Sequence, residues 1–150
     1  MTLPAITCRQ PWAGLIAAGL KLVENRGANT SLRGDIAIHA GKQVDMGEML
    51  RQAKAVGDSA PISVLGAVLA VAELVDCHPA SAALRCRCGP YGIQVYNGRP
   101  AYHLVLANVR RLPAPVECRG QVLIGWPLPN DVDAAVRAQL PHSPASLKEQ

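Results

Sequence analysis

The sequence predicts an α+β fold in which a mixed β-barrel is flanked by two or three helices. Short strand-like segments are spread along the chain with two helical patterns between them, without the regular alternation of βαβ units. Runs rich in Val and Ile favour strands. Apolar residues make up 49% of the 150 residues, which is enough for one packed core in one domain.

The start of the chain predicts a strand, a helix and then a charged segment. We expect the strand at residues 2–8 and the opening of the helix at residues 10–12. Pro11 suits the first helical position, where its missing N–H would have no helical partner. Gly19 is placed to end this helix, because glycine readily adopts the left-handed conformation found there.

Residues 20–26 alternate in character, as strand residues do. Strict alternation would place Lys21 and Glu24 on opposite faces, but a turn at the entrance of the strand would let these two side chains converge. Arg26 lies on the same side as Glu24. The segment can therefore bring two cations and one carboxylate together.

The middle of the chain predicts a short strand followed by a second helix. An apolar strand is expected at residues 35–40, ending at His39. Asp45 resembles a helix N-cap, with Glu48 three residues further on as in a capping box. The helix that Asp45 starts is expected at about residues 46–56.

Apolar runs predict the remaining strands. The longest run, residues 62–77, predicts a central strand bent near Gly66, because its Val, Ile and Gly content argues against a buried helix. Two further strands are expected at residues 102–109 and 122–126. The tail at residues 131–150 is expected to be partly helical or frayed.

Charge and composition limit the classes of function. Fifteen basic and eleven acidic residues give a net charge of +4, which permits an anionic partner such as nucleic acid without requiring one. No run approaches the roughly 20 apolar residues that span a bilayer, so no membrane partner is expected. The N-terminus lacks a secretory signal. Five cysteines then suggest reduced thiols and a cytoplasmic location.

Five segments, in order along the chain, resemble the ASCH domain family. They are Arg9-Gln10-Pro11-Trp12-Ala13, Gly19-x-Lys21-x-x-Glu24-x-Arg26, Gly34-Asp35-x-x-x-His39-Ala40, the strand at residues 66–73, and the strand and turn at residues 111–120. The second segment is the most specific. The resemblance covers most of residues 3–128, so we expect an ASCH domain at residues 1–130, followed by the tail.

The resemblance implies a barrel similar to PUA domains, with a cleft beside it that binds RNA or modified nucleosides. Some small family members hydrolyse N4-acetylcytidine to cytidine, some act as ribonucleases, and others are binding modules of transcriptional coactivators. The hydrolysing members resemble K-x-x-T-x-R in the charged segment, with the Thr as nucleophile. Glu24 replaces this Thr here, so the catalytic residues of those members do not transfer intact.

The charged segment carries the chemistry expected of such a cleft. Lys21 and Arg26 can hold a phosphate or a base carbonyl. Glu24 can accept a hydrogen bond from an exocyclic amine or act as a general base. Glu73 lies late in an apolar strand and is expected to pair with Lys21 or Arg26, because an unpaired buried charge is costly. A salt-bridged surface turn is the alternative that charge spacing alone leaves open.

Four further predicted ligand-binding residues each have a structural alternative. Trp12 could stack on a base or pack in the core. Gln10 could bind a base edge or cap the helix. His39 could be functional or an inert structural histidine. Lys42 could contact a phosphate or simply be an exposed lysine.

A second group of polar residues could bind a metal ion. Cys77, His78, Cys86 and Cys88 offer three thiols and an imidazole within twelve positions, a donor set that suits tetrahedral Zn²⁺. Their spacing departs from the common C-x₂-C pattern, which favours reduced thiols in a loop, with a disulfide as a lesser alternative. We therefore predict no metal and no cofactor.

Three functions are compatible with the sequence. The preferred prediction is a module that binds RNA or a nucleoside without covalent chemistry. The alternative is a small hydrolase of acylated nucleosides, or a ribonuclease, in which Lys21 and Glu24 are the catalytic pair. A protein-interaction domain is the third, because five aromatic residues offer few stacking platforms, but it leaves the charged segment unexplained. The sequence leaves the oligomeric state open.

Overall fold

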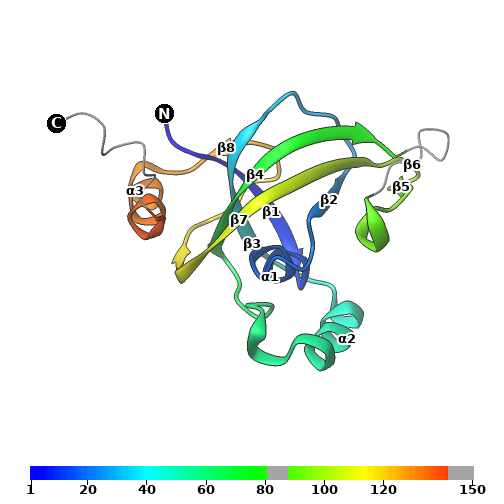
Figure 1. Ribbon diagram of the computed structural model, residues 1–150, viewed down its shortest axis with the longest axis horizontal. Helices are drawn as coiled ribbons and strands as arrows, with labels where there is room; N and C mark the ends of the chain where they lie inside the picture. Colours follow the sequence, from blue (N-terminus) through cyan, green and yellow to red (C-terminus); the bar gives the residue numbers. More distant parts are fainter. Residues whose placement is uncertain (81–87, 142–150) are drawn as a thin grey trace.

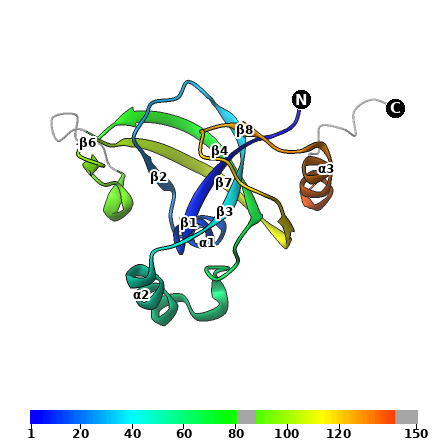
Figure 2. The same ribbon diagram turned by 180° about the vertical axis from the view of Figure 1, so that it is seen from behind.

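The computed structural model describes residues 1–80 and 88–141, and Figures 1 and 2 show its fold from opposite sides. The described strands are β1 (Pro4–Gln10), β2 (Val23–Arg26), β3 (Gly34–Val44), β4 (Ala67–Pro79), β5 (Val95–Tyr96), β6 (Arg99–Pro100), β7 (Tyr102–Glu117) and β8 (Trp126–Pro127). The described helices are α1 (Trp12–Ala17), α2 (Met46–Val56) and α3 (Asn130–Gln139), with short 3₁₀ turns η1 (Gly57–Ser59) and η2 (Gly89–Tyr91).

Six strands form one sheet in the order β2-β7-β4-β3-β1-β8, while β5 and β6 pair separately. β1 runs parallel to β3, and the other neighbouring strands are antiparallel. The predicted α+β class with a mixed sheet and flanking helices is therefore confirmed. Within the described residues no hydrogen-bonded ladder joins the edge strands β2 and β8, so the described part of the sheet is not a closed barrel. A side chain still links the edge strand β2 to β1, which lies next to the other edge strand β8, because Arg26 Nη2 donates to Thr7 O at 2.6 Å.

The first elements lie slightly later in the chain than predicted. β1 runs from Pro4 to Gln10 rather than from residue 2 to residue 8, because its parallel pairing with β3 continues to Gln10. Pro11 is the N-cap residue of α1 and not its first helical residue. Gly19 ends the helical turn as predicted, with a φ of +75° and its N–H donating to Ile16 O at 2.9 Å.

Several strand boundaries differ from the prediction. β3 does not end at His39 but continues to Val44. β4 begins at Ala67 rather than at residue 62, because Gly66 has a φ of +64° and interrupts the extended backbone. β7 runs to Glu117 rather than to residue 109, since register shifts let it follow β4 for its whole length.

The predicted last strand is mostly wrong. β8 contains only Trp126 and Pro127, while Val122 and Leu123 are 87% and 73% exposed. The apolar run at residues 122–126 resembled a buried strand, but its first part forms an exposed loop. Helix α2 was predicted correctly, and the Asp45 side chain caps it by accepting from Glu48 N at 3.0 Å.

The main core packs α1 against one face of the sheet, and a second cluster packs α3 against the opposite face, because the two clusters use alternating residues of β1, β3 and β4. Figure 1 shows α1 and α3 on different sides of the sheet. Val132 and Val136 of α3 pack with Leu3 and Trp126. Asp133 fixes this contact, because its Oδ1 accepts from Leu3 N at 2.7 Å. In the part of the chain that the structure describes, the helices are too short or too polar to cross a bilayer.

Candidate functional site

A cleft of about 1010 Å³ lies where β1 and β2 approach each other. Its walls come from β1, the charged segment at residues 21–26, the end of β3, residues 90–96 and the loop at residues 118–122. Its described lining residues include five cationic side chains, namely Arg9, Lys21, Arg26, Lys42 and Arg119, and a single carboxylate, that of Glu24. Arg9 and Arg119 lie within family-like segments of the sequence, but they were not predicted as binding residues.

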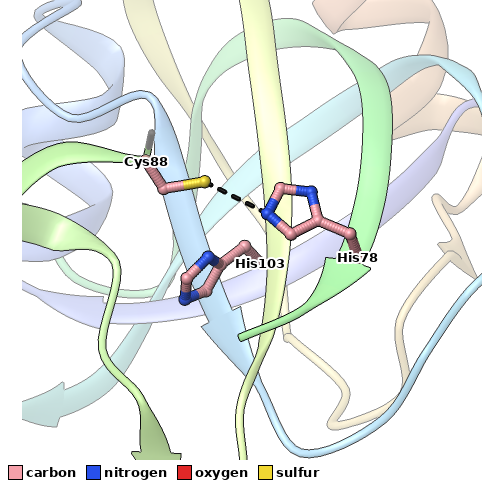
Figure 3. Close-up of side chains that lie close together, drawn as sticks. All are labelled: His78, Cys88 and His103. Carbon is pink, nitrogen blue, oxygen red and sulfur yellow. Dashed lines mark hydrogen bonds between the residues drawn. The ribbon is translucent and has the colours of Figure 1, made fainter. Parts of the chain in front are cut away.

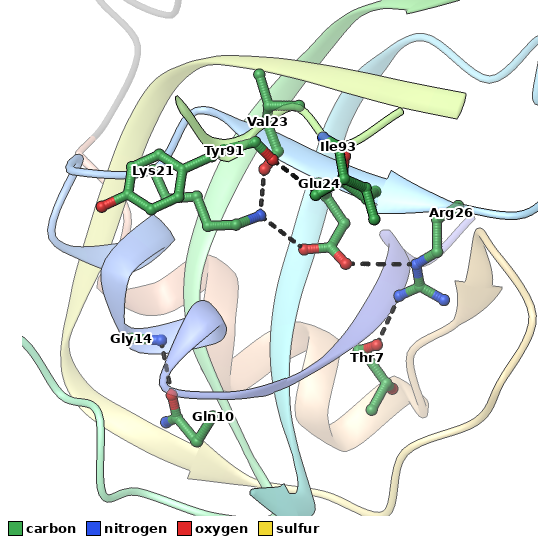
Figure 4. A network of polar contacts seen from close by, with 10 residues as sticks. Thr7, Gln10, Gly14, Lys21, Val23, Glu24, Arg26, Tyr91 and Ile93 are labelled. Atoms are coloured by element: carbon green, nitrogen blue, oxygen red, sulfur yellow. Dashed lines mark hydrogen bonds and ion pairs between the residues drawn. The ribbon is translucent and has the colours of Figure 1, made fainter. Parts of the chain in front are cut away.

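The structure brings Lys21, Glu24 and Arg26 together (Figure 4). Lys21 Nζ lies 3.2 Å from Glu24 Oε2, and Arg26 Nε lies 3.7 Å from Glu24 Oε1. Lys21 precedes β2, so the alternation of the strand does not constrain it, and its ammonium group also donates to Val23 O. The Lys21 and Glu24 side chains are only 4% and 13% exposed. The trio is therefore a buried ion cluster and not a solvated surface turn.

Arg26 also connects the two sides of the cleft. Its Nη2 donates to Thr7 O at 2.6 Å, and its Nη1 lies 3.4 Å from Val122 O. Burial disfavours its charge, but at the high pH where an arginine titrates the deprotonated Cys8 and Glu24 are both negative, and together they raise the pKa of Arg26. Among the described residues, Arg26 Nε is the one buried side-chain polar atom without a hydrogen-bond partner. Arg26 Nε still has the Glu24 carboxylate as an ionic neighbour at 3.7 Å, and an unsatisfied buried donor of this kind is unusual.

Cys8 is a cleft residue that the sequence did not reveal. Burial raises the pKa of its thiol to about 12, and the negative charge of Glu24 adds to this effect. Cys8 is therefore a neutral thiol near pH 7 and not a nucleophilic thiolate. Its only sequence signal is its position directly before the Arg9–Ala13 motif.

Aromatic side chains form one wall of the cleft. The Trp12 and Tyr91 rings meet edge to face at 6.2 Å between centroids, and Lys21 Nζ lies 5.9 Å from the Trp12 ring centroid. Asn25 of β2 holds residues 91–93 in place, because its side chain donates to Tyr91 O at 2.7 Å and accepts from Ile93 N at 3.1 Å. Tyr91 is far along the chain from residues 19–26, so the residue spacing of the charged segment could not predict that Tyr91 lines the cleft.

Gln10 lies beneath the cleft and does not line it. It is fully buried, and its Oε1 accepts from Gly14 N at 2.9 Å. Its Nε2 donates to Pro61 O and Val64 O at 2.8 and 2.7 Å. Both ends of this side chain therefore serve the fold, which corresponds to the helix-capping alternative.

His39 lines the cleft, but both of its ring nitrogens have protein partners. Nδ1 lies 3.2 Å from Thr7 Oγ1, and Nε2 lies 2.7 Å from Cys118 O. Trp126 Nε1 donates to the same Thr7 oxygen at 3.1 Å, so the Thr7 hydroxyl can donate onward to His39 Nδ1. This series of hydrogen bonds fits a neutral His39 ring with its proton on Nε2. Burial also favours the neutral form, because it lowers the pKa of His39.

The last two predicted binding residues lie in different places. Lys42 is exposed at the edge of the cleft. Glu73 does not line the cleft, and the predicted pairing with Lys21 or Arg26 is wrong, because both cations face Glu24. The β3–β4 register places Glu73 beside Asp35 instead.

The structure rearranges the predicted metal-binding group. His78 and Cys88 lie together, and their third neighbour is His103 of β7, which the sequence did not suggest. Cys77 is buried in β4 and belongs to the main core. Cys86 lies outside the described residues.

A curved mixed sheet, flanking helices and a cation-lined cleft around a buried ion cluster define a small α+β domain with one polar cleft among the described residues. The chain belongs to the ASCH domain family, which matches residues 6–115. The family predicted from the sequence motifs is therefore confirmed. No curated protein is similar enough to this chain to count as a match.

Proposed function

We propose that this ASCH domain binds RNA or a modified nucleoside in the cleft between β1 and β2. The observation that carries the proposal is the lining of the cleft, where five cations and one carboxylate lie beside the rings of Trp12, Tyr91 and Tyr96. Lys and Arg neutralise phosphates, and aromatic rings stack on unpaired bases. Three of the five aromatic residues of the chain line this cleft. The few rings that could stack on bases are therefore concentrated at one place.

The cations of the cleft divide into two groups. Lys21 and Arg26 are engaged with Glu24 and with backbone carbonyls, so they fix the shape and charge of its floor. Arg9, Lys42 and Arg119 are exposed at its edges, where phosphates would reach them. In this arrangement the Glu24 carboxylate would face the base as an acceptor, while Arg26 Nε stays turned toward Glu24.

Removing an edge cation should weaken RNA binding and reduce its dependence on salt. In fluorescence anisotropy with a labelled single-stranded RNA, we expect Lys42→Ala to bind more weakly. The slope of log K against log salt should become shallower by about 0.7, the value for one lost phosphate contact. Lys54→Ala is the matched control, because Lys54 is exposed on α2 and does not line the cleft. Equal effects of the two variants, or no RNA binding by the wild type at low salt, would contradict binding of RNA in the cleft.

The same variants and salt concentrations distinguish a nucleoside ligand from RNA. N4-acetylcytidine and cytidine carry no phosphate, so calorimetric binding of either should be nearly independent of salt and insensitive to Lys42→Ala. If neither nucleosides nor RNA bind, the proposed function is wrong.

Glu24 supports hydrolysis as a second candidate function. A carboxylate held between Lys21 and Arg26 at the floor of a cleft could act as the base for a water molecule, which is easier chemistry than direct attack on an acyl carbon. The substrates would be an acylated nucleoside or RNA. Chromatography of N4-acetylcytidine and of RNA after incubation tests this candidate. Turnover that survives in a folded Glu24→Gln variant, or no turnover by the wild type, would eliminate it.

We also propose a barrel-like role for the sheet and a cytoplasmic location for the protein. The sheet would act as the incomplete wall of a PUA-like barrel, with Arg26 and Thr7 spanning the gap between β2 and β1. A cytoplasmic location follows from the sequence prediction of reduced thiols.

A further inference from the structure

The polar cluster of His78, Cys88 and His103 lies outside the proposed RNA cleft, and its side chains point toward one another (Figure 3). One potential ligand atom from each residue lies within 4.8 Å of the others. Cys88 Sγ is 3.3 Å from His78 Nε2, and the two imidazole rings meet edge to face with centroids 5.3 Å apart. One sulfur and two imidazole nitrogens form a donor set typical of zinc sites.

The sheet itself fixes the two histidines. His78 of β4 and His103 of β7 are directly opposite each other in the antiparallel register, so their side chains share one face of the sheet. Cys88 then approaches from the segment before η2. Gly92 permits this approach, because a Cβ at Gly92 would lie 2.8 Å from Cys88 Cβ and 3.0 Å from His103 Cε1.

Each histidine has an acceptor on the ring nitrogen that is not needed for a metal. His78 Nδ1 lies 2.7 Å from Asp76 Oδ2, and His103 Nε2 lies 2.7 Å from Ile93 O. Histidines that bind metals almost always donate their second ring N–H to a carboxylate or to a backbone carbonyl, which fixes the tautomer and the direction of the ring. Both kinds of acceptor are present here.

We propose that His78, Cys88 and His103 bind one Zn²⁺ ion. The ligand atoms would be His78 Nε2, Cys88 Sγ and His103 Nδ1. Tetrahedral Zn–N and Zn–S bonds require ligand atoms about 3.4–3.6 Å apart, so the 3.3 Å between sulfur and His78 Nε2 already fits. The third ligand atom lies no more than 4.8 Å from the other two, so it needs to move inward by at most about 1.4 Å to reach the tetrahedral spacing. The described residues supply three ligands, and water or another ligand would complete the tetrahedron.

Zinc at this position would stabilise one wall of the cleft. Cys88 directly precedes η2, and η2 carries Tyr91, which packs on Trp12. The Ile93 carbonyl that orients His103 belongs to the same segment, and Asn25 already holds the Ile93 N–H. The ion would thus tie β4 and β7 to the aromatic wall. This inference does not depend on which ligand the cleft binds.

Direct metal binding tests the site with the 150-residue chain. After removal of metal by a chelator, we expect the chain to take up one equivalent of Zn²⁺ by calorimetry. Co²⁺ should give the visible bands of a tetrahedral ion and a near-ultraviolet charge-transfer band from the thiolate. Cys88→Ser should lose the charge-transfer band, and His103→Gln should weaken binding. Asp76→Asn should weaken Zn²⁺ binding by about 10- to 100-fold without removing a ligand.

Cys77→Ala is the matched control, because Cys77 is the neighbour of His78 but packs in the core. It should bind Zn²⁺ like the wild type. The proposal is overturned if the wild type binds no Zn²⁺, or if Cys88→Ser keeps the Co²⁺ charge-transfer band. Wild-type Zn²⁺ affinity in Asp76→Asn also contradicts it. Asp76 is exposed, so this variant provides the decisive measurement even if Cys88→Ser or His103→Gln fails to fold.

Discussion

Glu24→Ala is expected to lower the free energy of unfolding by about 3–5 kcal/mol, because it leaves a buried lysine without its counter-charge. The Lys21 side chain is 4% exposed, so water cannot replace the lost carboxylate. Arg26 would lose its ion pair at the same time. Urea unfolding at pH 7, monitored by circular dichroism, measures the change.

Two further variants test whether the unpaired buried charge causes the loss of stability in Glu24→Ala. Lys21→Met combined with Glu24→Leu replaces the pair by apolar side chains and should recover part of the stability lost in Glu24→Ala, because Lys21 no longer leaves a buried charge without a partner, while Arg26 still lacks its ion pair. Asp35→Ala breaks a more exposed ion pair, in which Arg110 contacts both oxygens of Asp35, at 2.6 and 3.2 Å. It should cost no more than about 1 kcal/mol. If Glu24→Ala lowers the free energy of unfolding no more than Asp35→Ala does, the buried ion cluster stabilises the fold no more than an exposed ion pair.

The double variant also separates stability from function. It should fold but bind the cleft ligand poorly, because the proposed acceptor for the base is gone. A stable double variant with wild-type affinity would show that Glu24 serves only the fold, and the aromatic wall would then be the main recognition element.

The sequence predicted the local parts of the site well. Lys21, Glu24 and Arg26 lie within six residues, so a turn before β2 was enough to explain their convergence. The cap at Asp45 and the helix end at Gly19 were predicted for the same reason, since capping depends on neighbouring residues.

Parts of the site that depend on strand register could not be predicted. Glu73 was expected to pair with Lys21 or Arg26, but the β3–β4 ladder places it beside Asp35. Tyr91 reaches Trp12 from almost eighty positions away, and His103 meets His78 only because β4 and β7 pair in one particular register. A one-residue shift of the pairing would turn Glu73 or His103 to the other face of the sheet, and sequence periodicity does not define that register.

Gly14→Ala is expected to destabilise the protein by about 3 kcal/mol, at the upper end of the range for overpacked cores. A Cβ at this position would lie 2.6 Å from both the carbonyl carbon and the oxygen of Pro61, and 2.7 Å from Ile62 Cα. These are backbone atoms, so no side chain can rotate away. Gln10 prevents the two segments from separating, because it bonds both Gly14 N and Pro61 O.

Gly47→Ala is the control for this substitution, since Gly47 also lies in a helix but has open space around it. Its nearest neighbour would be Asp45 Oδ1 at 3.6 Å, so Ala should change stability by less than about 1 kcal/mol, in the stabilising direction. Thermal and urea unfolding of both variants provide the comparison. Because Trp12 begins α1 and Gly14 follows it, a displaced α1 would also move the aromatic wall. Gly14→Ala should therefore bind RNA more weakly than Gly47→Ala under conditions in which both variants are folded, and equal stability and affinity of the two would contradict the role assigned to α1.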